Sequence, residues 1–144
     1  MKIAIASDHG GFDLKEQIQK HFASLKRDII DLGTYSADSC DYPDFAHKMV
    51  EYILQDQTDL GILICGTGVG ISIAANRFKG IRAAILYDDF TAEMAKKHNN
   101  ANIMVFGGRT MKLEDVLRRI DIFLNTEFEG GRHNNRLIKI EEGI

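Results

Sequence analysis

A cysteine and three alternating glycines stand together in the stretch LGILICGTGVGISIAA, residues 60–75. The apolar run ends at Cys65, and a pattern typical of a helix begins a few residues later. Backbone N–H groups at the start of a helix bind anions, and the positive helix end favours the thiolate form of a nearby cysteine. Such a thiolate would act as a base or a nucleophile. The nearby hydroxyl of Thr67 both donates and accepts protons. The loop residues whose amides would face an anion are Gly66, Thr67, Gly68, Val69 and Gly70.

Two common nucleotide-binding loops do not fit this stretch. No Gly-Lys-Ser/Thr follows, as a Walker A loop requires, and Ile71 stands where a dinucleotide fingerprint has its third glycine. A structural alternative stays open, in which the glycines serve only a tight turn and Cys65 is a small buried core residue.

Further polar residues occur at three other places. Asp8 and His9 follow the apolar residues 3–6 and would suit a metal pair, an acid–base pair, a substrate clamp or a plain turn. A zinc site requires more ligands at recognisable spacing, so metal is the weaker choice. Arg132 and Arg136 would share a helix face and bind a phosphate, or lie in a solvated tail. His98 by itself indicates only an exposed histidine near a helix end.

Short apolar runs alternate with helical patterns along the whole chain. Predicted strands are 3–6, 29–32, 60–64, 81–87 and 103–106, and predicted helices are 14–25, 43–54, 69–78, 91–99 and 113–124. This alternation predicts an α/β fold: a three-layer, Rossmann-like sandwich with a mostly parallel five-stranded sheet and helices on both faces. We expect one domain over residues 1–144, with a polar C-terminal segment (about 127–144) that is a loose tail or packs on a partner subunit.

In such sheets ligands bind beyond the carboxyl ends of the strands. Asp8, Cys65 and Arg109 each come within three residues after the end of a predicted strand, so we expect them at one edge. The net charge is −3 and the basic residues are scattered, which argues against nucleic acid as a partner. No apolar run reaches the length of a membrane span, and the N-terminus does not resemble a signal peptide. We therefore expect a cytoplasmic protein whose two cysteines are reduced.

The residues alone favour acid–base chemistry on a small phosphorylated molecule held by backbone amides and arginines. Two alternatives from other classes stay open: a Cys-His hydrolase, and a regulatory module that binds a sugar phosphate without turnover.

Six segments resemble the type B ribose-5-phosphate isomerases, a family shared with galactose-6-phosphate isomerase subunits. They are IASDHGGFDLK (5–15), DYPDFA (41–46), ICGTGVGISIAANRFKGIRAA (64–84), HNNAN (98–102), FGGR (106–109) and EGGRHNNR (129–136). The resemblance implies interconversion of D-ribose 5-phosphate and D-ribulose 5-phosphate through an enediol, without metal or other cofactor, in the non-oxidative pentose phosphate pathway. Allose 6-phosphate and galactose 6-phosphate remain alternative substrates.

The resemblance also implies roles for single residues. Cys65 would carry the proton between C1 and C2, Thr67 would help move a proton between O1 and O2, and the loop amides would stabilise the enediolate. His98 would open the sugar ring with help from Asp8. The implied phosphate ligands are His9, Arg109, Arg132 and Arg136, with Asn99 on the sugar and Tyr42 as a pocket wall. His133 receives no role.

Members of this family form homodimers or homotetramers with sites at the subunit interface. The resemblance therefore implies that His98, Asn99 and Arg109 reach the pocket of a neighbouring subunit.

Overall fold

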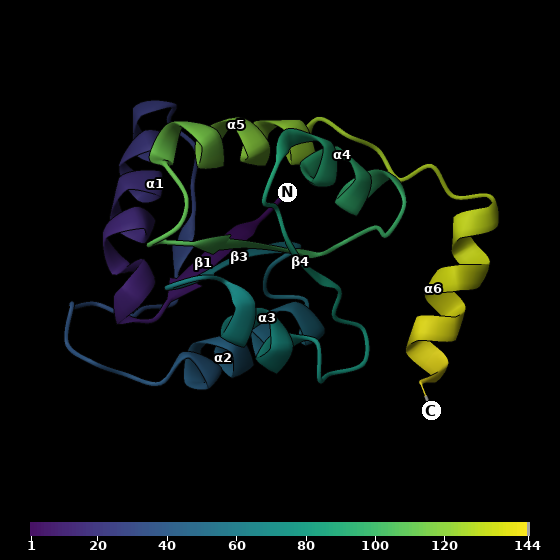
Figure 1. The fold of residues 1–144 in the computed structure, drawn as a ribbon, viewed down its shortest axis with the longest axis horizontal. Helices are drawn as coiled ribbons and strands as arrows, with labels where there is room; N and C mark the ends of the chain where they lie inside the picture. The colour runs from purple at the N-terminus through teal and green to yellow at the C-terminus, as the bar shows by residue number, and fades with distance from the viewer. Residues whose placement is uncertain (144) are drawn as a thin grey trace.

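Five parallel strands form one sheet in residues 1–143, the part of the chain that the computed structural model describes (Figure 1). The strands are β1 (Ile3–Ser7), β2 (Ile30–Asp31), β3 (Leu60–Cys65), β4 (Ala83–Ile85) and β5 (Ile103–Gly107), in the spatial order β2-β1-β3-β5-β4. Every residue of β1, β3 and β5 is buried, which explains their near-continuous apolar sequences. The expectation of a mostly parallel five-stranded sheet is confirmed, and all pairings in it are parallel.

Helices cover both faces of this sheet (Figure 1). On one face lie α1 (Phe12–Ser24), α4 (Asp89–Lys97) and α5 (Leu113–Leu124), and on the other lie α2 (Tyr42–Leu54) and α3 (Val69–Ala75). The side chains of each strand alternate between two apolar clusters: Ile62 and Ile64 pack toward the first group of helices, Leu63 and Cys65 toward the second. This arrangement confirms the three-layer sandwich.

Three predicted elements are shorter in the structure, among them the second strand, which covers Ile30–Asp31 instead of 29–32. The fourth strand covers Ala83–Ile85 instead of 81–87, and the third helix ends at Ala75 rather than near residue 78. The amides of Arg82 and Ala83 donate instead to the side chains of Asn102 and Asn76, at 2.8 Å each. Ala83 is the first residue of β4 that pairs with β5, so these bonds mark where the strand begins, and apolar periodicity does not reveal them.

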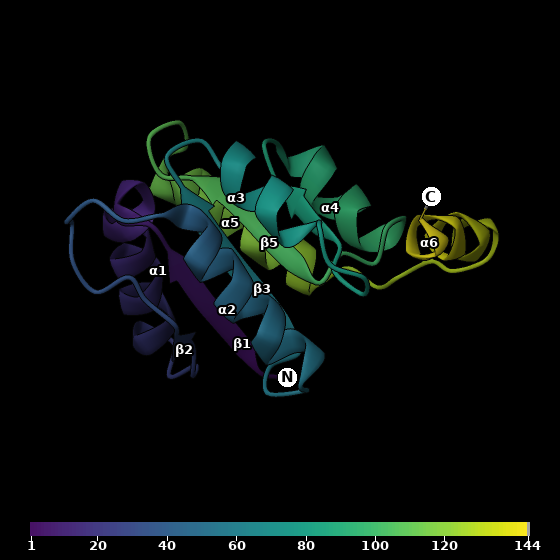
Figure 2. The ribbon, with the colours of Figure 1, turned by 90° about the horizontal axis from the view of Figure 1, so that it is seen from below.

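The C-terminal segment forms α6 (Arg132–Glu142), which stands beyond the end of the layered body (Figures 1 and 2). Glu141 joins it to the body, because its carboxylate accepts from the amide of Gly80 at 2.8 Å and from the guanidinium of Arg82 at 3.0 Å. Ile138 and Ile140 are each more than half exposed on this helix. The last residue of the segment expected over 127–144 lies outside the described residues. Within residues 1–143, no helix combines the length and the apolar character that a membrane crossing demands.

Candidate active site

Cys65 ends β3 and lies at the base of the glycine loop. Its side chain is only 5% exposed, and the amide of Gly68 donates a hydrogen bond to its sulfur at 3.2 Å. Gly68 adopts φ +84°, a left-handed conformation that favours glycine, immediately before α3 begins. The turn therefore aims an N–H group at the sulfur of Cys65.

Thr67 occupies the exposed tip of the same loop. Its hydroxyl oxygen accepts from the amide of Val69 at 3.2 Å. The hydroxyl proton is therefore free to point toward a ligand, and a second lone pair of the oxygen stays available. This arrangement suits a group that passes a proton between two neighbouring oxygens.

The residues after β1 lie against this loop. Asp8 is buried, and its carboxylate accepts from the amide of Gly10 at 2.9 Å. A Cβ on Gly10 would lie 3.0 Å from the amide nitrogen of Gly66, so the glycine permits the close approach of the two loops. The amide of Cys40 donates to Nδ1 of His9 at 3.2 Å. The neutral ring of His9 consequently carries its proton on Nε2, as a phosphate donor requires.

Arg109 and Tyr42 complete this edge of the sheet. The amide of Arg109 donates to the carbonyl of Gly66 at 2.9 Å, and its guanidinium lies over Gly66, with Nη1 3.2 Å from the position of a Cβ there. Arg109 therefore lies beside the loop of its own chain. The expectation that it reaches a neighbour's pocket stays a prediction. The Tyr42 ring covers Gly70, since a Cβ on Gly70 would lie 2.6 Å from the ring.

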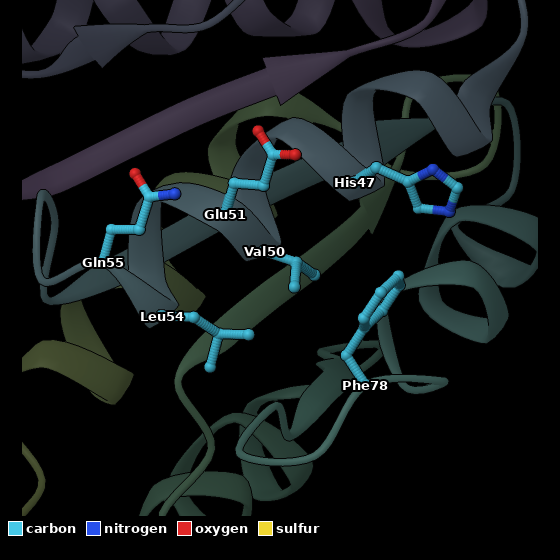
Figure 3. Close-up of a pocket in the computed structure, with 6 residues that line it drawn as sticks. All are labelled: His47, Val50, Glu51, Leu54, Gln55 and Phe78. Carbon is cyan, nitrogen blue, oxygen red and sulfur yellow. The ribbon is translucent and has the colours of Figure 1, made fainter.

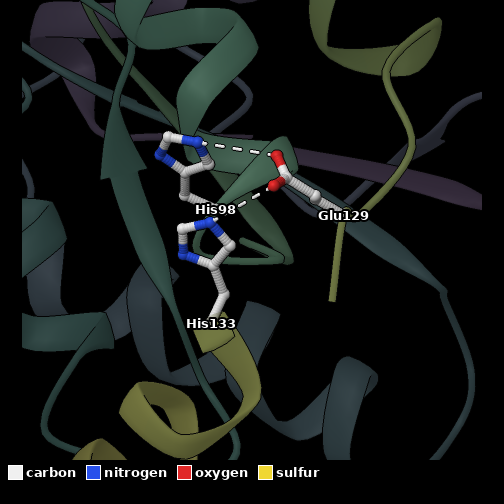
Figure 4. A group of neighbouring side chains, drawn as sticks. All are labelled: His98, Glu129 and His133. Carbon is white, nitrogen blue, oxygen red and sulfur yellow. Dashed lines mark ion pairs between the residues drawn. The ribbon is translucent and has the colours of Figure 1, made fainter. Parts of the chain in front are cut away.

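His98 lies in a different group of side chains (Figure 4). Its ring stacks on that of His133 with centroids 4.2 Å apart, and Nε2 of each ring is 3.9 Å from a carboxylate oxygen of Glu129. Burial, followed by the charges of His98 and Arg132, lowers the pKa of His133 below its ordinary 6.5, although Glu129 opposes the shift.

The strand register separates these two groups. His98 follows α4, and the chain then enters β5 through Asn102, whose carbonyl accepts from the amide of Gly61 at the beginning of β3. Cys65, at the other end of β3, pairs with Gly107 at the end of β5. Four residues of strand span about 13 Å at roughly 3.3 Å per residue. A single chain thus places His98 near the opposite edge of the sheet from Cys65.

The structure accordingly divides the sequence-predicted site residues into two sets. Asp8, His9, Arg109 and the loop 65–70 share the carboxyl edge. His98 and Asn99 lie at the amino edge, and Arg132 and Arg136 extend along the exposed side of α6 near them. Sequence reasoning did not assign Glu129, although it stands within EGGRHNNR, nor the contact of Cys40 with His9. Nothing in the local pattern reveals either contact, because both join segments brought together by the fold.

A pocket of about 380 Å³ opens elsewhere, between α2 and Phe78 (Figure 3). His47, Glu51 and Leu54 line it, and it contains none of the residues predicted to do chemistry. The residues predicted to do chemistry lie instead at the loop edge, away from this pocket.

Comparisons with known proteins agree with this architecture. The family model described as Ribose/Galactose Isomerase matches residues 3–140. Ribose-5-phosphate isomerase B of Escherichia coli is 43% identical over 136 residues, which cover 94% of this chain and 91% of that protein. A ribose 5-phosphate isomerase structure from Thermotoga maritima superposes with a TM-score of 0.96 at 51% identity, covering 98% of this chain and 97% of the other. The chain belongs to the ribose/galactose isomerase family.

A structure of ribose-5-phosphate isomerase B from Mycoplasma genitalium contains bound ribulose-5-phosphate. It is 42% identical to this chain, with a TM-score of 0.92 and coverage of 98% of this chain and 94% of the other.

Proposed function

We propose that this chain isomerises D-ribose 5-phosphate and D-ribulose 5-phosphate through an enediol, with Cys65 as the base that moves the proton between C1 and C2. The observation that carries the proposal is the thiol at the end of β3, which accepts from the Gly68 amide at the start of α3. Removal of a carbon-bound proton requires a positioned base, and the hydrogen bond from the Gly68 amide fixes the sulfur of Cys65 at the start of α3.

The loop would also stabilise the charge that the reaction creates. As the proton leaves carbon, negative charge develops on the carbonyl oxygen of the sugar. Fixed backbone N–H donors at a helix start stabilise such charge without reorganising during the reaction. Thr67, with its hydroxyl proton free, would then pass a proton between O1 and O2. The guanidinium of Arg109 and Nε2–H of His9 would bind the phosphate at this edge.

Ring opening requires a separate acid–base group, because only the free aldehyde can enolise. His98 would supply it, and the geometry of one chain places His98 too far from Cys65 to serve the same sugar. We therefore propose that two copies of the chain form each active site, with His98, Asn99 and the C-terminal segment from one copy facing the loop of the other. A homodimer is the smallest assembly that satisfies this requirement.

The first experiment measures ketose formation from ribose 5-phosphate by the wild type, Cys65→Ala and His98→Asn, with EDTA present. We expect Cys65→Ala to lose at least about 1,000-fold in kcat/KM, the range of a positioned acid–base group. Folding and phosphate binding should persist, since the thiol contributes little packing volume. If the wild type converts neither five-carbon nor six-carbon sugar phosphates, a regulatory module that binds a sugar phosphate without turnover would describe this protein better.

A substrate that cannot form a ring separates the role of His98 from the role of Cys65. D-erythrose 4-phosphate cannot close a furanose ring through its phosphorylated oxygen. His98→Asn should therefore lose far more activity on ribose 5-phosphate than on the four-carbon substrate, each relative to the wild type. Cys65→Ala should lose activity on both. Equal losses by His98→Asn on both substrates would contradict the ring-opening role.

Subunit complementation tests the shared site directly. A mixed dimer of Cys65→Ala and His98→Asn chains has one site with both defects and one site with neither. Random mixing by co-refolding should restore about a quarter of the wild-type activity, because half of the dimers are mixed and one of their two sites is intact. A mixture that stays as inactive as its parents would show that each chain completes its own site.

A further inference from the structure

We propose that His98, Glu129 and His133 form a binding site for a divalent transition-metal ion such as Zn²⁺, and that the bound ion inhibits the enzyme. The inhibitory part rests on the proposed ring-opening role of His98, whereas the binding site stands on geometry alone.

The three side chains present a ligand set that zinc favours (Figure 4). One ligand atom from each residue lies within 4.8 Å of the others. Nε2 of His98 is 3.9 Å from Oε2 of Glu129, and Nε2 of His133 is 3.9 Å from Oε1. Two imidazoles and one carboxylate are the protein ligands of several zinc sites that keep a fourth position open.

Only a small closure is needed for coordination. Tetrahedral zinc with ligands at about 2.0–2.1 Å places ligand atoms roughly 3.4 Å apart, so ligand atoms that now lie within 4.8 Å of one another must close by at most about 1.4 Å. The two rings now stack with an interplanar angle of 14°, and they must splay for both lone pairs to converge on the ion. His98 is about one-third exposed and ends its helix, so it has room to turn.

His133 provides an independent sign of a missing ligand. Its side chain is 5% exposed, and its Nε2 is buried without a hydrogen-bond partner. A buried polar atom that stays unpaired costs stability, and such atoms in native proteins need an explanation. This nitrogen faces Glu129 and has no hydrogen-bond partner, so it is placed to offer a lone pair to an ion.

The backbone holds the three residues in place before any ion binds. The amide of Glu129 donates to the carbonyl of Lys97 at 2.9 Å, which fixes Glu129 beside His98. The amide of His133 donates to the carbonyl of Gly130 at 3.1 Å and begins the turn that brings His133 back to Glu129. Arg132, with Nη1 3.8 Å from Glu129, is the competing cation and would swing toward solvent when the ion binds.

Metal binding would occupy Nε2 of His98, the side chain to which the proposed function assigns ring opening. A histidine nitrogen that donates its lone pair to zinc can no longer accept a proton from the sugar. The ion would therefore suppress turnover of ring-closed substrates, and chelation would restore it. The four-carbon substrate, which needs no ring opening, should be inhibited less.

Titration calorimetry with Zn²⁺ on the EDTA-treated, full-length wild type tests the site. We expect one ion per subunit, with affinity at least about 10-fold weaker in Glu129→Gln and in His133→Asn. His21→Asn, a change to a histidine far from the site, is the matched control and should bind as the wild type does. Cys65→Ala should also retain binding, which excludes the loop thiol as the principal ligand.

The activity arm measures the Zn²⁺ concentration that halves ribose 5-phosphate turnover. Both Glu129→Gln and His133→Asn should raise it at least about 10-fold, in step with their weaker binding. Unchanged affinity in both variants, or binding lost only in Cys65→Ala, would overturn the site. Calorimetric binding by a chain that does not isomerise sugar phosphates would retain the site and reject the proposed function, so the two failures are distinguishable. Circular dichroism confirms folding, and either variant alone suffices if the other fails to fold.

Discussion

The ammonium group of Lys15 is fully buried, and we predict that its main partner, Asp31, cannot be neutralised without a large loss of stability. Nζ of Lys15 lies 2.9 Å from both carboxylate oxygens of Asp31. Glu16 at 3.1 Å and Gln19 at 3.3 Å complete its surroundings. Asp31 also accepts from the amide of Gly33 at 2.9 Å. The ion pair therefore joins α1 to β2 and to the turn beside the end of β1.

The expected loss follows from the burial of each partner. Breaking a buried pair by removing one charge costs about 3–5 kcal/mol. Glu16 remains near the ammonium in Asp31→Asn, so we expect about 2–3 kcal/mol, or roughly 6–10 °C in Tm for a chain of this size. In Lys15→Met the carboxylate of Asp31, whose side chain is 26% exposed, takes up water instead. That variant should therefore lose only about 1 kcal/mol.

The pH dependence has a definite sign. Burial raises the pKa of Asp31, but the hydrogen bonds from Lys15, the Gly33 amide and Gln19, with the charge of Lys15, outweigh it and hold the pKa below 3.8. A depressed folded-state pKa gives stability that is present above pH 3.8 and is lost as the pH falls through the folded value. The Tm difference between the wild type and Asp31→Asn should thus narrow below about pH 4.

Thermal unfolding at one fixed protein concentration measures these differences, because assembly makes Tm depend on concentration. Lys15→Met/Asp31→Asn should be more stable than Asp31→Asn alone, since no buried charge remains unpaired. Equal losses in the two single variants, or a Tm difference that does not change with pH, would refute the reasoning.

Two further predictions concern the glycine loop and α6. Gly68→Ala places a Cβ at φ +84° and 3.2 Å from the carbonyl of Phe106, so the turn must shift and the amide that donates to Cys65 moves with it. We expect kcat to fall at least about 10-fold. An unchanged kcat would show that this amide does not contribute to catalysis. Glu141→Ala removes the acceptor of the Gly80 amide and of Arg82. Because α6 carries Arg132 and Arg136, the KM for ribose 5-phosphate should rise while kcat changes little. Steady-state kinetics, with Glu142→Ala as the control variant, measure both constants.

The shared-site proposal explains why an exposed, charged α6 extends from the layered body. Alone it buries few of its apolar side chains, and Ile138 and Ile140 are each more than half exposed. A neighbouring copy would cover these side chains and bring the arginines to the phosphate. Truncated chains that lack α6 are therefore expected to lose both assembly and activity.

The sequence by itself determined the fold class and the loop edge of the candidate site. Buried parallel strands read as continuous apolar runs, and Cys65, Asp8 and Arg109 each follow such a run, so their place at one edge follows from the direction of the strands. Local patterns also located the turn at residues 66–70, because the glycines there serve a left-handed backbone and a close approach of two loops.

Only the tertiary structure decided which candidate site residues lie close together. The return path of α4 puts His98 at the far edge from Cys65, and the path after α5 brings Glu129 and His133 to it. Arg109 likewise proved to lie beside its own Gly66. These contacts join residues distant in the chain through packing and side-chain hydrogen bonds, which periodicity does not encode because it describes only neighbours within one element.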